Sequence, residues 1–114
     1  MNDCLFCSII AGKIPSAKVY EDEHVFAFRD IEPQAPVHVL IVPKKHVQNA
    51  LALQGELSAI AGHVYAAAGK IAVSEGIAES GFRVITNCGK DGAQSVQHLH
   101  FHLLGGKQLS GKMD

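Results

Sequence analysis

The stretch that decides the fold runs Gln94-Ser95-Val96-Gln97-His98-Leu99-His100-Phe101-His102-Leu103-Leu104. Within it, three histidines alternate with apolar residues, which is the period of two that a β-strand imposes on its side chains. We therefore expect a strand whose apolar face seals a core while a row of imidazoles faces a cleft. Because histidine both gives and accepts protons near neutral pH, such a row indicates proton-transfer or nucleophilic chemistry.

A single metal ion held by all three histidines is disfavoured by the geometry of a strand. At roughly 3.3 Å per residue, His98 and His102 lie about 13 Å apart along the chain. A zinc–nitrogen bond is only about 2.0–2.1 Å long. One of the three histidines could still serve a metal while the others do chemistry.

The size and composition of the chain limit the classes of function. Its 114 residues suit one domain, 1–114, and 47% hydrophobic with 18% charged residues is typical of a globular protein. The net charge is -1 and no basic stripe is present, so we expect no nucleic-acid polymer as partner, although a single nucleotide is possible.

The same composition predicts a cytoplasmic protein without a membrane partner. The first residues lack a basic region followed by a long apolar run, so we expect no signal peptide. The longest strongly apolar run, Val39 to Val42, is far too short to span a bilayer. Three cysteines, an odd number, argue against a disulfide framework and favour the reducing cytoplasm.

Periodicity predicts an order of strands and one long helix. Alternating or β-branched segments predict strands at 18–21, 24–30, 38–42 and 82–87 before the histidine strand. The segment at 38–42 is apolar on both faces, which predicts a central strand. From about Gln54 to Glu75 the apolar period becomes helical, and Gly76 is placed as a C-terminal cap.

One face of the predicted helix is built from small residues, Gly62, Ala66 and Gly69. Two glycines inside a helix each cost about 1 kcal/mol relative to alanine. Close approach by another backbone would justify that cost, and simple tolerance would explain it equally well. If the approach is real, this face predicts a homodimer with the helix at its interface.

Two further segments carry chemistry-bearing residues. Cys4-Leu5-Phe6-Cys7 is a CxxC pair, which can be redox-active, metal-binding or incidental. As a zinc site it supplies only two ligands, and histidine is the natural source of the other two. The glycine-rich loop at 88–93 runs into the histidine strand and can aim backbone N–H groups at an anion.

These motifs together resemble the histidine triad (HIT) superfamily, and within it the Hint-like branch. The residues that carry the resemblance are His98-Leu99-His100-Phe101-His102-Leu103-Leu104, Asp30-Ile31-x-Pro33-Gln34-Ala35-Pro36-x-His38, Pro43-Lys44-Lys45-His46 and Gly92-x-Gln94-Ser95-Val96. The resemblance implies an α+β, HIT-like fold, with an antiparallel sheet of about five strands, one long helix and a short N-terminal helix. It also implies a homodimeric hydrolase of purine nucleoside phosphoramidates.

The resemblance assigns roles residue by residue. It makes His100 the nucleophile, supported by His38, and makes Asp30 the acceptor of the ribose hydroxyls. The remaining nucleotide contacts that it implies are His102, Ser95, Asn87 and Gln94 at the phosphoryl group, and Leu5, Phe6, Ile9, Ile14, Phe28 and Ile31 around the base. Some bacterial members resemble this chain in a structural zinc site, which here would use Cys4, Cys7, His46 and His98.

Three alternative functions stay open at this point. The first is a dinucleoside polyphosphate hydrolase, which needs the same nucleophile. The second is a nucleotide-binding regulatory module with little turnover, and retained binding without hydrolysis would identify it. The third is a zinc-stabilised interaction module whose histidine row is structural.

Overall fold

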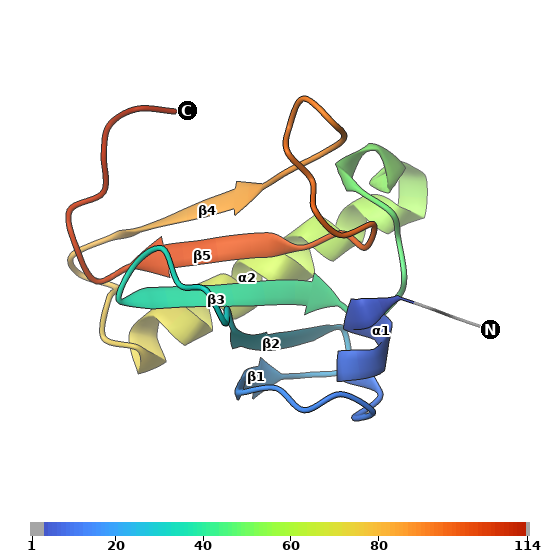
Figure 1. The fold of residues 1–114 in the computed structure, drawn as a ribbon, viewed down its shortest axis with the longest axis horizontal. Coiled ribbons are helices and arrows are strands. Elements are labelled where there is room, and N and C mark those ends of the chain that lie inside the picture. Colours follow the sequence, from blue (N-terminus) through green and yellow to red (C-terminus); the bar gives the residue numbers. More distant parts are fainter. Residues whose placement is uncertain (1–3, 114) are drawn as a thin grey trace.

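The computed structural model describes residues 4–113, which form a five-stranded antiparallel sheet with helices on both faces (Figure 1). The strands lie in the order β1-β2-β3-β5-β4, and β3 is central, as its two apolar faces predicted. Their bounds are Lys18–Glu21 for β1, Val25–Arg29 for β2, Val37–Pro43 for β3, Phe82–Thr86 for β4 and Phe101–Gly105 for β5. The α+β class is therefore confirmed.

The long helix α2, Ala59–Ser74, packs across one face of the sheet (Figure 1). The helix predicted from about residue 54 therefore begins later, because its first turn, Gly55–Ser58, is a separate 3-10 helix, η2. A second short 3-10 helix, η1, precedes it at Ala50–Ala52. Gly76 ends the helix as predicted, with a φ of 74°. The N–H groups of Gly76 and Ile77 donate to the carbonyls of Val73 and Ala72, which satisfies the carbonyls of the last turn.

The strands bury a separate apolar cluster on each face of the sheet. On β2, Val25 and Ala27 join the cluster under α2, while Phe26 and Phe28 alternate onto the opposite face. There they pack with the short N-terminal helix α1, Leu5–Ile10, which lies at one end of the sheet (Figure 1). The opposite face is thus covered only in part, and the histidine row lies on it.

The histidine segment is extended as predicted, but β5 begins only at Phe101. Leu99, Phe101 and Leu103 all point into the cluster under α2, so the period of two continues through residues 98–100. Those residues lie outside the strand ladder: the pairing with β3 stops at Ile41–Phe101, although β3 itself continues to Pro43 beside β2, and β4 ends at its Thr86–Phe101 pair. Beyond that point the Leu99 N–H donates to the carbonyl of Val47 in a loop.

Within the described part of the chain, residues 4–113, no helix has both the length and the apolar character needed to cross a membrane.

Candidate active site and metal-ligand cluster

A cleft of about 630 Å³ opens on the sheet face that carries the histidine row. Most of the predicted nucleotide-binding residues line it. They are Leu5, Phe6, Ile9, Ile14, Phe28, Asp30, Ile31, Ser95, His100 and His102. Phe6 from α1 packs edge-on against the ring of His100 at 5.0 Å and against Phe28 at 5.7 Å, so α1 closes one end of the cleft.

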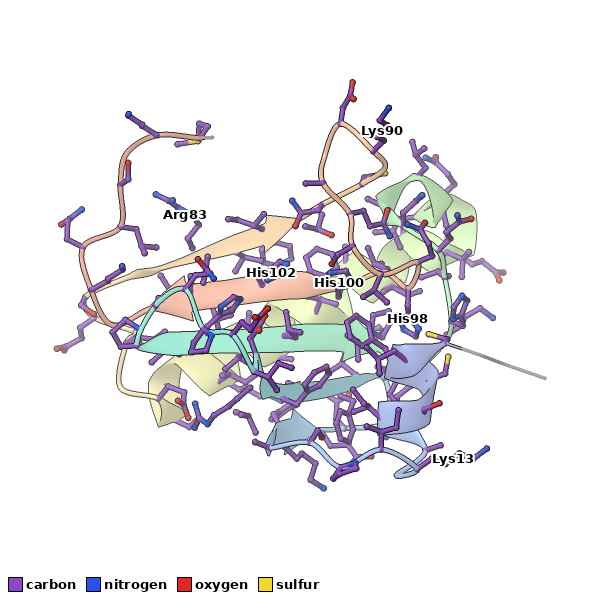
Figure 2. The ribbon with its side chains drawn as sticks, viewed as in Figure 1. Lys13, Arg83, Lys90, His98, His100 and His102 are labelled. Carbon is purple, nitrogen blue, oxygen red and sulfur yellow. The ribbon has the colours of Figure 1, made fainter. Side chains whose placement is uncertain are left out.

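The three histidines lie in a row from α1 toward the middle of β5 (Figure 2). His100 is buried, and its Nδ1–H donates to the carbonyl of His98 over 2.8 Å. A neutral imidazole carries one N–H, so this hydrogen bond leaves Nε2 with its lone pair. In this tautomer His100 can act as a nucleophile toward a group in the cleft.

His102 is held in the complementary tautomer by a chain of hydrogen bonds. The Gln34 backbone N–H donates to His38 Nδ1 over 3.0 Å, so the His38 proton sits on Nε2. From there it is donated to His102 Nδ1, 2.9 Å away. His102 therefore carries its own proton on Nε2 and can donate it to a group in the cleft.

Burial keeps this chain of rings neutral. Desolvation, aided by the neighbouring His100 and His38 and opposed by the charge of Asp30, lowers the pKa of His102 to about 4. Desolvation also lowers the pKa of His38, again against Asp30. Both rings are therefore uncharged near pH 7 when the cleft holds no ligand.

Asp30 lies beside this chain at the end of β2. Its Oδ1 accepts the Glu32 backbone N–H over 2.8 Å, and its Oδ2 lies 3.4 Å from His38 Nε2. The carboxylate keeps free lone pairs on the cleft side, because each oxygen can accept more than one hydrogen bond. Asp30 can thus accept hydroxyl donors from a ligand.

Two predicted residues, Asn87 and Gln94, do not line the cleft. Asn87 Nδ2 donates to the carbonyl of Gly92, and the Gln94 amide bridges Gly89 to the carbonyls of Gln48 and Val96. Both side chains thus hold the glycine-rich loop at 88–93 in place, and Ser95, which follows this loop, lines the cleft. Their predicted nucleotide contacts stay predictions.

The four predicted zinc ligands, Cys4, Cys7, His46 and His98, come together at the end of the sheet beside α1. Their ligand atoms all lie within 4.8 Å of one another. Cys4 Sγ is 3.2 Å from His98 Nδ1, and Cys7 Sγ is 3.3 Å from His46 Nδ1. His98 Nε2–H donates to the carbonyl of Pro43 over 2.9 Å, which leaves Nδ1 as the free lone pair facing the sulfurs. The donor set and this tautomer fit a tetrahedral metal site.

A second group, Asp30, His38 and His102, also brings its potential ligand atoms within 4.8 Å of one another. A metal on His38 Nε2 would require the proton to move to Nδ1. That proton would then face the Gln34 N–H, and two donors would oppose each other. This group therefore fits a hydrogen-bond relay better than a metal ion.

Some residues of the site carry no recognisable signal in the sequence. Gln34 acts through its backbone, and any residue but proline supplies an N–H there. The segment Pro15-Ser16-Ala17 and the side chains of Leu40 and Val96 also line the cleft. Gln34 does stand in the motif Asp30-Ile31-x-Pro33-Gln34-Ala35-Pro36 that joins β2 to β3, whereas the segment at 15–17 belongs to no such motif.

Known proteins resemble this chain along nearly all of its length. The HIT domain family model matches residues 11–109. A purine nucleoside phosphoramidase of Escherichia coli K12 is 46% identical over 108 residues, which covers 95% of this chain and 91% of that protein. An uncharacterised HIT-like protein of Synechococcus elongatus is also 46% identical, over 96% of this chain and 95% of its own length.

Solved structures that resemble this chain belong to the same family as the sequence relatives. A histidine triad protein from Clostridium difficile superposes with a TM-score of 0.95 at 48% identity, over 98% of this chain and 97% of that one. A HIT family hydrolase from Clostridium thermocellum gives 0.96 at 48% identity, over 99% and 98% of the two chains. With the histidine row, the sheet order and the match over residues 11–109 in agreement, the chain belongs to the HIT domain family.

Proposed function

We propose that the protein is a hydrolase that cleaves purine nucleoside 5′-phosphoramidates, such as AMP–amine conjugates, through a covalent nucleotidyl–His100 intermediate. The observation that carries this proposal is the tautomer of His100. Its Nδ1–H is donated to the His98 carbonyl, so the Nε2 lone pair is available at the cleft. The phosphoramidase from Escherichia coli at 46% identity supports the choice of substrate class.

In the first step, His100 Nε2 attacks phosphorus, a P–N bond to the imidazole forms, and the P–N bond to the amine breaks. The ring becomes cationic, because it then carries both Nδ1–H and the phosphoryl group. The His98 carbonyl already accepts the Nδ1–H and stabilises that charge without rearrangement. In the second step, water attacks phosphorus and gives a proton to His102, which has protonated the amine, while the bond to His100 breaks and the ring leaves as the neutral base. The products are the nucleoside monophosphate and the amine.

His102 is the proposed partner at the phosphoryl group. Its Nε2–H can donate to a phosphoryl oxygen or to the departing nitrogen. A bound phosphoryl group places negative charge beside the ring and raises its pKa from the low value of the empty cleft. His102 can then deliver a proton to the amine, while the Ser95 hydroxyl lines the cleft as a further donor.

The nucleoside would occupy the rest of the cleft. A purine presents two flat apolar faces, which suit the walls formed by Leu5, Phe6, Ile9, Ile14 and Phe28. Ile31 is 96% exposed and would cover the base from the rim of the cleft. The free lone pairs of Asp30 would accept the ribose hydroxyls, and the charge of the carboxylate strengthens such bonds.

We also propose that the Cys4, Cys7, His46 and His98 cluster holds one structural Zn²⁺. A closed site with two sulfur and two nitrogen ligands stabilises a fold by joining distant segments. Here it would join the start of α1 to the loop after β3 and to the segment before β5. The ion would have no part in the chemistry at His100.

A homodimer is the third part of the proposal. The outer face of α2 is exposed and mostly small or apolar, and Val73 and Tyr65 on it are 70% and 55% exposed. Beyond the neighbouring residues and backbone of its own helix, a Cβ added at Gly62 or Gly69 would meet no atom of the described chain within 4 Å. The glycines therefore have no packing role inside the described chain, which supports a role in close contact with a second copy.

A substrate panel tests the proposed function. It comprises AMP–lysine, AMP–tryptamine, a GMP analogue and a diadenosine polyphosphate, each compared by kcat/KM. We expect the amine conjugates to be the best substrates. Preference for the diadenosine compound would favour the polyphosphate hydrolase, and AMP binding without turnover of any substrate would favour a regulatory module.

A further inference from the structure

The cysteine pair that closes the metal cluster also flanks the residue that forms the wall of the nucleotide cleft. Phe6 lies between Cys4 and Cys7 in sequence, is 4% exposed, and lines the cleft. Its ring packs edge-on against His98 at 5.8 Å and against His100 at 5.0 Å. The turn that carries Phe6 therefore joins the two cysteines, and a change in the distance between their sulfurs acts on that turn.

His98 connects the same cluster to the nucleophile. Its Nδ1 faces the two sulfurs, at 3.2 Å from Cys4 and 3.6 Å from Cys7, while its carbonyl accepts the Nδ1–H of His100. The residue is fully buried, and its Nε2–H is fixed to Pro43. A shift of the His98 ring thus reaches the edge of Phe6, and a shift of its backbone reaches the hydrogen bond that sets the His100 tautomer.

Both cysteines are accessible to a small oxidant. Each is half-buried, and a surface hollow of about 190 Å³ lies beside Cys7, lined also by Ser8, Ala11 and Lys13. The sulfurs already lie within 4.8 Å of each other. Two sulfurs on one tetrahedral zinc are about 3.7 Å apart, whereas a disulfide bond is about 2.05 Å long.

We propose that Cys4 and Cys7 are a reversible redox-modification site that controls nucleotide binding, an inference that rests on the proposed nucleotide cleft. Reduced and metal-bound, the pair holds Phe6 against His100. A hydroperoxide takes one electron from each of the two thiolates, the Cys4–Cys7 disulfide forms, and the oxidant and two solvent protons leave as water and an alcohol. Both metal–sulfur bonds break, and the ion, left with His46 and His98 alone, dissociates.

Oxidation then weakens nucleotide binding by moving the wall of the cleft. Closing the sulfurs by more than an ångström displaces the first turn of α1, and His98 loses the partner of its Nδ1 while its Nε2–H stays on Pro43. Phe6 no longer covers the cleft end in the same position. A dithiol reductant with added Zn²⁺ restores the first state, because thiolate attack on the disulfide regenerates both ligands.

The test uses the full chain with Cys88→Ser, so that Cys4 and Cys7 are the only cysteines and every intramolecular disulfide is theirs. Zinc-loaded protein is treated with tert-butyl hydroperoxide and then with dithiothreitol plus Zn²⁺. We expect the intact mass to fall by two hydrogens on oxidation, one equivalent of zinc to appear with a chromogenic chelator, and AMP to bind at least about fivefold more weakly by calorimetry. Reduction with zinc should reverse all three changes.

Phe6→Leu provides the matched variant. It keeps the disulfide chemistry but removes the edge of the aromatic ring, so its AMP affinity should change with oxidation by much less than that of the parent. An unchanged AMP affinity in the oxidised parent, retained zinc, or equal sensitivity in Phe6→Leu would overturn the proposal. So would loss of the folded circular dichroism spectrum on oxidation, because the cysteines would then maintain the whole fold rather than the cleft. Failure of the reduced, zinc-loaded parent to bind AMP would instead refute the proposed function.

Discussion

The His100 Nδ1–H donates to the main-chain carbonyl of His98, two residues earlier on the same extended segment. The backbone that carries the nucleophile therefore also sets its tautomer, and no separate carboxylate is needed to orient the ring. The carbonyl is available for this hydrogen bond because the segment before Phe101 lies outside the strand ladder, where no neighbouring strand pairs with it.

Replacing His100 by asparagine should abolish the covalent intermediate. Asparagine retains a polar group of similar size, so the cleft and Asp30 should still bind AMP with similar affinity. In single-turnover mixing with an AMP–amine substrate, intact-mass detection should find a nucleotidyl adduct on the wild type and none on His100→Asn. Equal turnover of the two proteins would refute nucleophilic catalysis by His100.

His102→Ala should be slowed rather than inactivated. It removes the Nε2–H donor but leaves the His100 lone pair, and positioned acid–base groups typically contribute about 10²–10⁴-fold. The loss in kcat/KM should fall in that range with a tryptamine leaving group. It should shrink for a leaving group of lower pKa, such as AMP linked to an aromatic amine, because that amine needs less help from a proton. A uniform loss across both substrates would argue against proton transfer by His102.

The lowered pKa of His102 makes the stability of the protein depend on pH. The pKa of His102 is about 4 in the folded chain against an ordinary value of 6.5, so between these limits the unfolded chain binds more protons. The stabilisation is therefore present above about pH 6.5 and is lost as the pH falls toward 4, by roughly 2–3 kcal/mol for this one group. Urea unfolding at pH 7 and pH 4.5 should show a smaller decrease for His102→Asn than for the wild type. Equal decreases would mean that His102 is not desolvated in the folded state.

Much of this architecture can be read from periodicity, because burial on a sheet face forces alternation. The segment 38–42 predicted the central strand from its two apolar faces, and the structure places β3 at the centre at Val37–Pro43. The helix at 54–75 was one turn too long in its α-helical form, because residues 55–58 adopt a 3-10 turn instead. Strand ends were less accurate than strand existence, since they depend on where a partner strand stops.

In the candidate site, the sequence identified side chains but not the protonation states that their hydrogen bonds impose. Its side chains could be named from motifs, but the tautomers could not, because they depend on backbone groups that no side-chain pattern specifies. Gln34 contributes an N–H and His98 a carbonyl, and neither contribution restricts the residue type. Gln94 stays a predicted nucleotide contact, and in the structure its amide group makes hydrogen bonds with the loop backbone.

Protein purified without chelator should carry about one zinc per chain. Removing the ion should lower the thermal midpoint, because two histidines and two cysteines from three distant segments lose their common partner. Cys7→Ser should behave like the metal-free protein, while Cys88→Ser, which alters a cysteine outside the cluster, should keep both the zinc and the midpoint. Metal-free wild type with an unchanged midpoint would count decisively against the site.

The face of α2 gives a prediction in which folding and association change in opposite directions. Gly62 is exposed, and a Cβ added there meets no atom of the described chain within 4 Å beyond its own helix neighbours. Leucine and alanine are both better helix formers than glycine, so either replacement should leave the helix as stable or more stable, by up to about 1 kcal/mol. A second copy packed closely against the glycine would tolerate the methyl group of alanine far better than the side chain of leucine.

Sedimentation at micromolar concentration should therefore show a dimer for the wild type, a dimer or a weakened dimer for Gly62→Ala, and a folded monomer for Gly62→Leu. The ordering matters more than any single value, because the two variants share helix propensity and differ mainly in the volume added to the face. A monomeric wild type would refute the dimer. A dimer that Gly62→Leu leaves intact would move the interface away from this face, and the edge strand β4, whose Phe82 is 42% exposed, would become the surface to test.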